Sequence, residues 1–359
     1  MLVDENTKQT FLTLVRLGIG VDSSASFETA DWETLQALVA EQGLAGVVVD
    51  GVEKLEDGLR PPKPVLLQWI GEVLQEETQN TIQQKAAIEM ALLFNHNEIR
   101  TYVLKGAVIA ECYPKPIHRS SADMDCFLLP NNGNFDAWDF GNCLMKNKGF
   151  EVRTSFYKNS TFLLPGLMVE NHQFLTPFRG NKRLKALERL LQTMLLKDSG
   201  EDRFEGTWLY RPPVMVSALF LVEHAYSHFL HEGLTWRHIL DWMMFKSRHE
   251  SEVDWAEFDA YVDEFGFRKF YDAYLRMGFY LMGELNEEDL SGKEKQLLAD
   301  IWAPLDLHET HHGVKGKLAL AGNTWRARWK YSYFTDISWI RALWIQVKGF
   351  LFMKHPSLD

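Results

Sequence analysis

Cysteine, basic charge and long apolar runs are the features that this sequence has little of. Its 359 residues include three cysteines, and no two of them have the Cys-x-x-Cys spacing. This excludes a disulfide framework and a zinc site built on cysteine pairs. The formal net charge of −11 argues against broad, nonspecific binding to nucleic acid, which needs basic surface, but it leaves room for a local basic groove.

Membrane and export signals are missing too. Apolar runs stay shorter than the ~20 residues that a spanning helix needs, so no transmembrane segment is expected. The first residues lack the basic-then-apolar pattern of a signal peptide, and a cytoplasmic protein is therefore expected. The composition, 46% hydrophobic and 24% charged, is typical of a soluble globular protein with two or three domains.

The most informative segment present is residues 104–129, LKGAVIAECYPKPIHRSSADMDCFLL. Asp123 and Asp125 lie in its apolar end, which predicts a strand. Strand side chains alternate between two faces, so both carboxylates project from one face and Met124 from the other. Adjacent carboxylates repel each other unless a cation lies between them, and Mg²⁺ prefers such oxygen ligands. The pair predicts a metal site, with a solvated strand face as the alternative.

Residues just before the aspartate pair are suited to phosphate. Gly106 lets the backbone approach a phosphate closely because it has no side chain. Arg119 and Ser121 could donate hydrogen bonds to phosphate oxygens, and Lys105 could compensate phosphate charge. The segment as a whole therefore predicts a site for a metal ion and a triphosphate.

A third carboxylate is expected on a later strand. The turn signal Pro165-Gly166 leads into a predicted strand over 167–175, in which Glu170 and His172 share a face. We assign Glu170 as the third carboxylate; the alternative is that both side chains face solvent on an edge strand. Between the Asp123-Asp125 strand and the Glu170 strand, the sequence predicts a helix over 136–148 and strands over 150–156 and 161–164.

A glycine turn, an Asp-x-Asp strand and a later carboxylate together resemble the DNA polymerase beta-like nucleotidyltransferase superfamily. The form Lys105-Gly106, Arg119, Asp123-x-Asp125 and Glu170-x-His172 most resembles its uncharacterised nucleotidyltransferase family. It is more distantly similar to the nucleotidyltransferase-like toxins of abortive-infection systems. Ala107 replaces the second small residue of the toxins' Lys-Gly-Gly-Thr, and the spacing from Gly106 to Asp123 is slightly longer than usual.

The resemblance implies an enzyme that moves a nucleoside monophosphate from an NTP to a hydroxyl acceptor and releases pyrophosphate. It implies Mg²⁺ or Mn²⁺ bound by Asp123, Asp125 and Glu170, with Glu170 helping to activate the acceptor. The acceptor could be a small molecule, a protein hydroxyl or an RNA end. Two rival hypotheses are a toxin-like or catalytically silent nucleotide-binding relative, and a non-enzymatic scaffold that docks a partner through its C-terminal tail.

Helical periodicity marks both ends of the chain. Apolar residues at three-to-four spacing over 9–16, 31–42 and 64–100 predict an N-terminal helical region, with its long helix ending near Asn95. Helices are also predicted over 214–230 and 234–242.

The C-terminal helices carry a set of polar residues that we expect, with His172, on the acceptor side of the cleft: His224, His228, Arg237 and Asp241. The i, i+4 spacing allows Arg237 and Asp241 to form an ion pair. The alternative is a helical bundle held by buried polar pairs. The spacing of His224 and His228 suits zinc, but neither a His-Glu-x-x-His motif nor a cysteine pair accompanies it, and the cluster His308–His312 is predicted as a solvated turn.

The C-terminal segment is basic, although the chain as a whole has a net negative charge. Residues 311–359 hold eight Lys and Arg against two Asp, interleaved with aromatic residues. Three interpretations remain open: a helix packed on the domain, a peripheral membrane contact, or a surface for an acidic partner or nucleic acid.

The sequence thus predicts an α+β fold, a small mixed β-sheet core flanked by N-terminal and C-terminal helical regions. The expected division is 1–85 for the N-terminal helices, 86–205 for the nucleotidyltransferase core, and 206–359 for the C-terminal helices with the basic aromatic tail.

Overall fold

The computed structural model describes residues 3–22, 31–178, 180–303, 325 and 327–352. The predicted turn at His308–His312 and part of the basic tail lie outside the described residues.

The N-terminal helices are α1 (Glu5–Ile19), α2 (Trp32–Gln42) and α3 (Ala45–Glu53). The Asp4 side chain caps α1 by accepting a hydrogen bond from the Thr7 amide at 2.9 Å. Helices α1 and α3 pack so closely that a β-carbon added to Gly51 would lie 2.1 Å from the Leu14 carbonyl oxygen. Only glycine fits at such a backbone contact.

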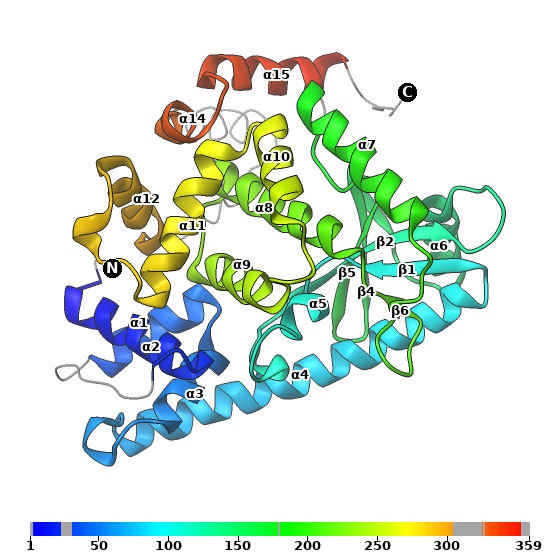
Figure 1. Ribbon diagram of the computed structural model, residues 1–359. Coiled ribbons are helices and arrows are strands. Elements are labelled where there is room, and N and C mark those ends of the chain that lie inside the picture. Colours follow the sequence, from blue (N-terminus) through cyan, green and yellow to red (C-terminus); the bar gives the residue numbers. More distant parts are fainter. Residues whose placement is uncertain (1–2, 23–30, 179, 304–324, 326, 353–359) are drawn as a thin grey trace.

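A single long helix, α4 (Lys63–Asn95), connects the N-terminal helices to the sheet (Figure 1). Pro64 lies in its first turn, where a missing amide hydrogen costs nothing. The helix ends at Asn95, as the sequence predicts. At 33 residues it is about 50 Å long.

The sheet has six strands in the order β3-β4-β5-β2-β1-β6. Their bounds are β1 (Ile99–Val103), β2 (Asp123–Pro130), β3 (Arg153–Phe156), β4 (Asn159–Leu164), β5 (Leu167–His172) and β6 (Leu209–Tyr210). The central pair, β2 and β5, is parallel, and so are β1 and β6, whereas the other neighbours are antiparallel. The predicted mixed sheet and α+β class are therefore confirmed.

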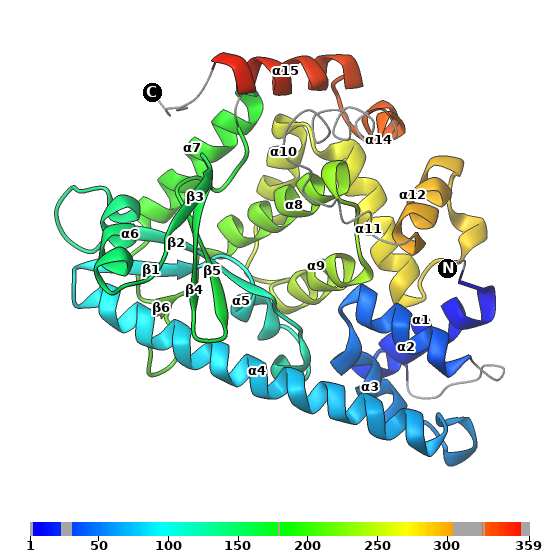
Figure 2. The ribbon, with the colours of Figure 1, turned by 180° about the vertical axis from the view of Figure 1, so that it is seen from behind.

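Helices cover both faces of this sheet. One face packs on α4 and on α6 (Ala137–Asn147), where a β-carbon at Gly141 would touch Leu128 of β2 and Phe94 of α4. The other face meets α8 (Val214–His231), where the rings of His172 and Phe220 lie 6.3 Å apart. Figure 2 shows α4 running in front of the sheet. The side chains of Asp123 and Asp125 are on the α8 face, as strand alternation predicts.

The remaining helices are α5 (Ala107–Ala110), α7 (Lys182–Lys197), α9 (Trp236–Arg248), α10 (Trp255–Phe265), α11 (Arg268–Met282), α12 (Gly292–Trp302), α14 (Arg328–Phe334) and α15 (Trp339–Phe352), with short 3₁₀ turns at Asp57–Leu59, Pro116–His118 and Glu287–Asp289. Helix α1 is tied to the C-terminal helices: Arg16 donates to the carbonyls of Tyr280 and Leu281 at the end of α11, both at 2.8 Å. The N-terminal and C-terminal helices therefore form one continuous packing unit.

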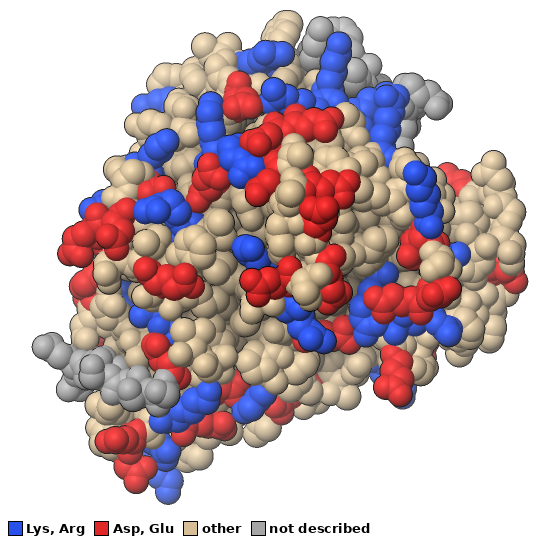
Figure 3. Space-filling model, viewed as in Figure 1, with Lys and Arg blue, Asp and Glu red and all other residues tan. Residues whose placement is uncertain are grey.

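The part of the tail that the structure describes is partly packed. In α14, Lys330 pairs with Asp300 at 2.8 Å and donates to the Phe229 carbonyl at 2.8 Å. In α15, Ile340 and Trp344 are 63% and 61% exposed. No described helix is both long and apolar enough to span a bilayer. Figure 3 shows acidic and basic side chains interspersed on the face in view.

Two buried carboxyl groups behind the site differ in their partners. Glu188 of α7 accepts from the Leu175 and Thr176 amides at 3.0 and 2.7 Å. Glu223 of α8 is 1% exposed, and neither carboxyl oxygen has a hydrogen-bond partner among the described residues. Burial raises the pKa of Glu223 to about 7, against a weaker opposing effect of Lys158.

Glu223→Gln is expected to stabilise the protein above pH 7. Below pH 4.5 Glu223 is protonated in both states, and between pH 4.5 and 7 the unfolded chain ionises first, so wild-type stability is lost as pH rises. The variant should avoid this loss, which amounts to at most about 3 kcal/mol of the free energy of unfolding. Urea unfolding of both proteins at pH 5 and pH 8 measures it. Glu89→Gln, at an exposed position of α4, should leave the curves unchanged. Equal variant and wild-type stability at pH 8 would contradict the prediction.

Candidate active site

The site is built on the parallel strands β2 and β5. Their register places Asp125 directly beside Glu170. Ligand atoms of Asp125, Glu170 and His172 all lie within 4.8 Å of one another. Asp123 is two residues before Asp125 on the same strand face and lines the larger cavity with Asp125 and Glu170, but it is outside the group whose ligand atoms lie within 4.8 Å of one another.

Asp125 is buried, 2% exposed, and is held from two sides. Lys105 lies 3.0 Å from its Oδ2, and the His172 ring contacts its Oδ1 at 2.9 Å. Burial alone would raise the pKa of Asp125, but Lys105 and then His172 outweigh it and hold the pKa well below its usual range. The Asp125 carboxylate is therefore held in place and ionised.

Positive groups act less strongly on the other two carboxylates: His172 and Lys158 oppose the raised pKa of Glu170, and Asp123 attracts Arg119 and Arg237. Burial raises the pKa of Glu170, and the charges of Asp125 and Asp123 raise it further. Glu170 accepts a hydrogen bond from the Asn159 amide at 2.7 Å. Asp123 has no hydrogen bond or ion pair to its carboxylate among the described residues. A divalent cation fits this donor set, because Mg²⁺ and Mn²⁺ prefer oxygen ligands and closely spaced negative charge.

Two cavities meet at Asp123 and Lys105, which line both. One, of about 380 Å³, lies between α4, α5 and the sheet, with apolar walls from Ala87, Ile88 and Leu167. The other, of about 600 Å³, lies between the sheet and helices α8 and α9 and is lined by polar residues that include Asp125, Glu170, Lys158, Arg237, His224, His228 and His238. Asp123 thus borders both the smaller, apolar cavity and the larger, polar one, whereas Asp125 and Glu170 line only the larger.

The predicted phosphate residues surround the smaller cavity. Gly106 has φ 65°, and a β-carbon there would lie 3.3 Å from the Ser121 hydroxyl and 3.7 Å from the Asp123 carbonyl oxygen. The Ser121 hydroxyl donates to that carbonyl at 3.0 Å. Lys105 also reaches His224, whose Nε2 accepts from its ammonium group at 2.9 Å.

Arg119 has a partner that the sequence pattern did not indicate. Its guanidinium makes two hydrogen bonds to Asp241, at 3.1 and 2.6 Å, and the Tyr113 hydroxyl donates to the same carboxylate at 2.7 Å. All three side chains are buried. Burial would raise the pKa of Asp241, but Arg119 outweighs it. Arg119 borders the smaller cavity, while its charge is already compensated by Asp241.

The predicted hydrogen-bonded ion pair between Arg237 and Asp241 does not form, because Asp241 accepts from Arg119 instead. The Arg237 guanidinium lies 3.3 Å from the Ser120 carbonyl oxygen and against Gly43, on the wall of the larger cavity. His224 and His228 line the same cavity. His172, which the sequence placed on the acceptor side, is 2% exposed and is not among the residues that line the larger cavity; its ring contacts the Asp125 carboxylate.

Sequence reasoning missed several residues of this site. His238 joins the two histidines of α8, Asn159 contacts Glu170, and Lys158 lines the larger cavity. Gln42 accepts from the Trp236 amide at 2.8 Å and so fixes the start of α9. The one local signal was His238 three residues after Thr235, where it completes a capping box.

The fold and the site define an α+β protein with a carboxylate cluster on two parallel strands. The family model described as "Uncharacterised nucleotidyltransferase" matches residues 28–283, and the chain belongs to this family. It is thus a nucleotidyltransferase by family, and the match includes every residue of the site described above. No curated protein and no solved structure matches the chain.

Proposed function

We propose that the protein transfers a nucleoside monophosphate from an NTP to a hydroxyl group of an acceptor. The observation that carries this is the alignment of Asp125 and Glu170 across β2 and β5, with the unpartnered Asp123 at the junction of two cavities. The same arrangement supports the resemblance to the DNA polymerase beta-like superfamily. The relation to abortive-infection toxins stays a prediction.

Three carboxylates and the glycine turn have distinct tasks in this proposal. Asp123, Asp125 and Glu170 would hold Mg²⁺ or Mn²⁺, which neutralises phosphate charge and acidifies a bound hydroxyl. The backbone at Gly106 and the Ser121 hydroxyl would contact the phosphates, and Lys105, which lines both cavities, would offset their charge. His172 keeps Asp125 ionised and oriented.

The reaction forms a bond from the acceptor oxygen to the α-phosphorus and breaks the bond to the bridging oxygen of the leaving pyrophosphate. Glu170 is placed to take the hydroxyl proton, since burial and the charge of Asp125 raise its pKa. The larger, polar cavity would receive the acceptor, which is consistent with a sugar, a protein hydroxyl or an RNA end.

The test begins with thermal shift of the full chain against the four common NTPs, with and without Mg²⁺ or Mn²⁺. We expect a rise in Tm that needs both NTP and metal, because ligands that bind only the folded state stabilise it. Labelled NTP is then incubated with protein and cell extract, and labelled acceptor and pyrophosphate are measured. Binding without transfer would favour a silent or toxin-like relative, and no binding would contradict the proposal.

Gly106→Val is expected to remove metal-dependent NTP binding. A side chain at this position would enter the space beside Ser121 that a phosphate needs, and its branched carbon is strained at φ 65°. Gly133→Val is the matched control: Gly133 has φ 78° in a loop, but a β-carbon there meets nothing within 4 Å. Both variants should remain helical by circular dichroism. Unchanged NTP affinity in Gly106→Val would place the triphosphate elsewhere.

A further inference from the structure

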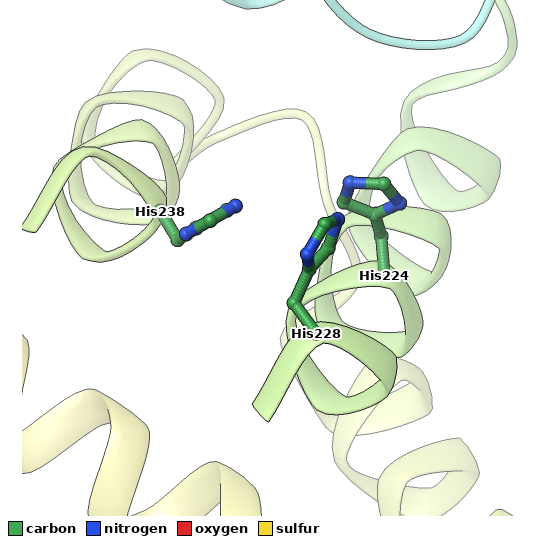
Figure 4. Close-up of side chains that lie close together, drawn as sticks. All are labelled: His224, His228 and His238. Atoms are coloured by element: carbon green, nitrogen blue, oxygen red, sulfur yellow. The ribbon is translucent and has the colours of Figure 1, made fainter. Parts of the chain in front are cut away.

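Three histidines from two helices converge in the larger cavity (Figure 4). His224 and His228 lie one turn apart on α8, and His238 reaches them from the first turn of α9. One ring nitrogen from each lies within 4.8 Å of the others. The ring centroids are 4.4 Å apart for His224 and His228 and 4.8 Å for His228 and His238.

Hydrogen bonds hold the outer nitrogens of two of these rings. Nδ1 of His228 contacts the Glu232 carboxylate at 2.9 Å. Nδ1 of His238 accepts the Thr235 backbone N–H at 3.1 Å in the capping box of α9 and lies 2.9 Å from the Thr235 hydroxyl; a metal ion at Nε2 requires the ring proton to move to Nδ1 and to be donated to that hydroxyl. A carboxylate or hydroxyl behind a histidine fixes its orientation and raises its strength as a metal ligand.

Burial also favours the neutral form of two of these rings. Burial lowers the pKa of His224 well below its usual range, and Lys105 and His228 lower it further. Burial lowers the pKa of His238 in the same way, with added effects of His228 and Arg237. A neutral imidazole has a lone pair on one ring nitrogen, which is the form that binds a metal ion.

We propose that His224, His228 and His238 form a second metal site, which binds one transition-metal ion of the zinc class. Three imidazole nitrogens suit zinc and its neighbours, whereas the carboxylates of β2 and β5 suit Mg²⁺ or Mn²⁺. Three protein ligands leave a fourth position open to the cavity, as in zinc sites that bind water or substrate.

The two sites are linked through one side chain. The ammonium group of Lys105 lies 2.9 Å from His224 Nε2 and 3.0 Å from Asp125 Oδ2. An ion at the histidines repels this ammonium group and moves it away from His224, toward Asp125 or bound phosphate. The histidine site does not depend on the proposed transfer reaction, because it is defined by its own ligands.

Binding of Co²⁺ tests the site directly, since this ion replaces zinc and its absorption reports coordination. The full chain, stripped with EDTA, is titrated with Co²⁺ in excess Mg²⁺, and bound metal is counted after equilibrium dialysis. We expect one Co²⁺ per chain, visible bands of a tetrahedral nitrogen site, and no sulfur-to-cobalt charge transfer from cysteine. Absence of binding to the wild-type chain would overturn the proposal.

Substitutions then locate the bound ion. His228→Ala should weaken Co²⁺ binding on the order of 100-fold or more, because it removes a ligand and not only its support. His231→Ala is the matched control, a histidine on α8 that lines the same cavity but is outside the cluster. Asp123→Asn should retain Co²⁺ while it loses Mg²⁺-dependent NTP binding, which separates failure of this proposal from failure of the transfer function.

His238→Ala gives a second location test, although it also removes part of the α9 capping box. Circular dichroism and Tm therefore accompany every titration. Folded His228→Ala and His238→Ala that both keep full Co²⁺ affinity would overturn the proposal. So would loss of Co²⁺ in Asp123→Asn, because the ion would then lie at the carboxylates.

Discussion

Asp123→Asn is expected to lower kcat/KM for nucleotide transfer on the order of a thousandfold, about 4 kcal/mol of transition-state stabilisation. The substitution keeps the shape of the side chain but removes a metal ligand and a unit of negative charge. The folded state should lose little, because the Asp123 carboxylate has no hydrogen-bond partner among the described residues and its repulsion of Glu170 offsets its attraction to Arg119 and Arg237.

The measurement is labelled-nucleotide transfer at saturating Mg²⁺, with Tm recorded in EDTA. Asp139→Asn, at an exposed position in the first turn of α6, removes the same charge far from the cavities and should keep full activity. If Asp123→Asn unfolds or melts many degrees lower in EDTA, Asp123 is a structural acceptor and the catalytic interpretation fails. An active and stable Asp123→Asn would remove Asp123 from the metal site.

The strand positions of the site were predictable because they depend on local geometry. Alternation with period two puts Asp123 and Asp125 on one face and Glu170 with His172 on one face, whatever the rest of the fold. The long helix α4 was predictable for a similar reason, since apolar residues keep a helical spacing along it. The α+β class followed from helical periodicity on both sides of these strands.

The partners of the polar residues on α9 were not predictable from spacing. Asp241 is one turn from Arg237, yet it accepts from Arg119 and Tyr113, which the loop before β2 brings to it. The i, i+4 spacing shows which side chains on one helix can pair with each other. It does not show which side chains from distant segments will contact them in the folded protein. His238 was missed for the same reason, because its neighbours are on another helix.

Short strands were also beyond the sequence signal. Strand β6 has two residues, Leu209 and Tyr210, and it exists because β1 offers an open edge. Two apolar residues carry no periodicity. The division into regions at residues 85 and 205 also stays a prediction. So does the partner of the C-terminal tail, because the structure contains a single chain.

Asp241→Asn is expected to destabilise the fold by about 3–5 kcal/mol, the cost of leaving a buried arginine without its counter-charge. Arg119 and Asp241 are both buried, and their two hydrogen bonds tie the loop before β2 to α9. Urea unfolding measures the loss. Glu151→Gln, which breaks the solvent-exposed pair with Arg153, should leave the unfolding midpoint unchanged.

The double variant Arg119→Met, Asp241→Leu distinguishes a structural pair from a phosphate ligand. Replacing both charges with apolar side chains should restore much of the stability, because neither is then buried without a partner. If NTP affinity is also retained, Arg119 is a structural residue that positions α9 against the site. If stability returns but NTP affinity falls tenfold or more, at least about 1.4 kcal/mol, Arg119 also contributes to phosphate binding. Nearly unchanged stability in Asp241→Asn alone would mean that Arg119 does not depend on this carboxylate.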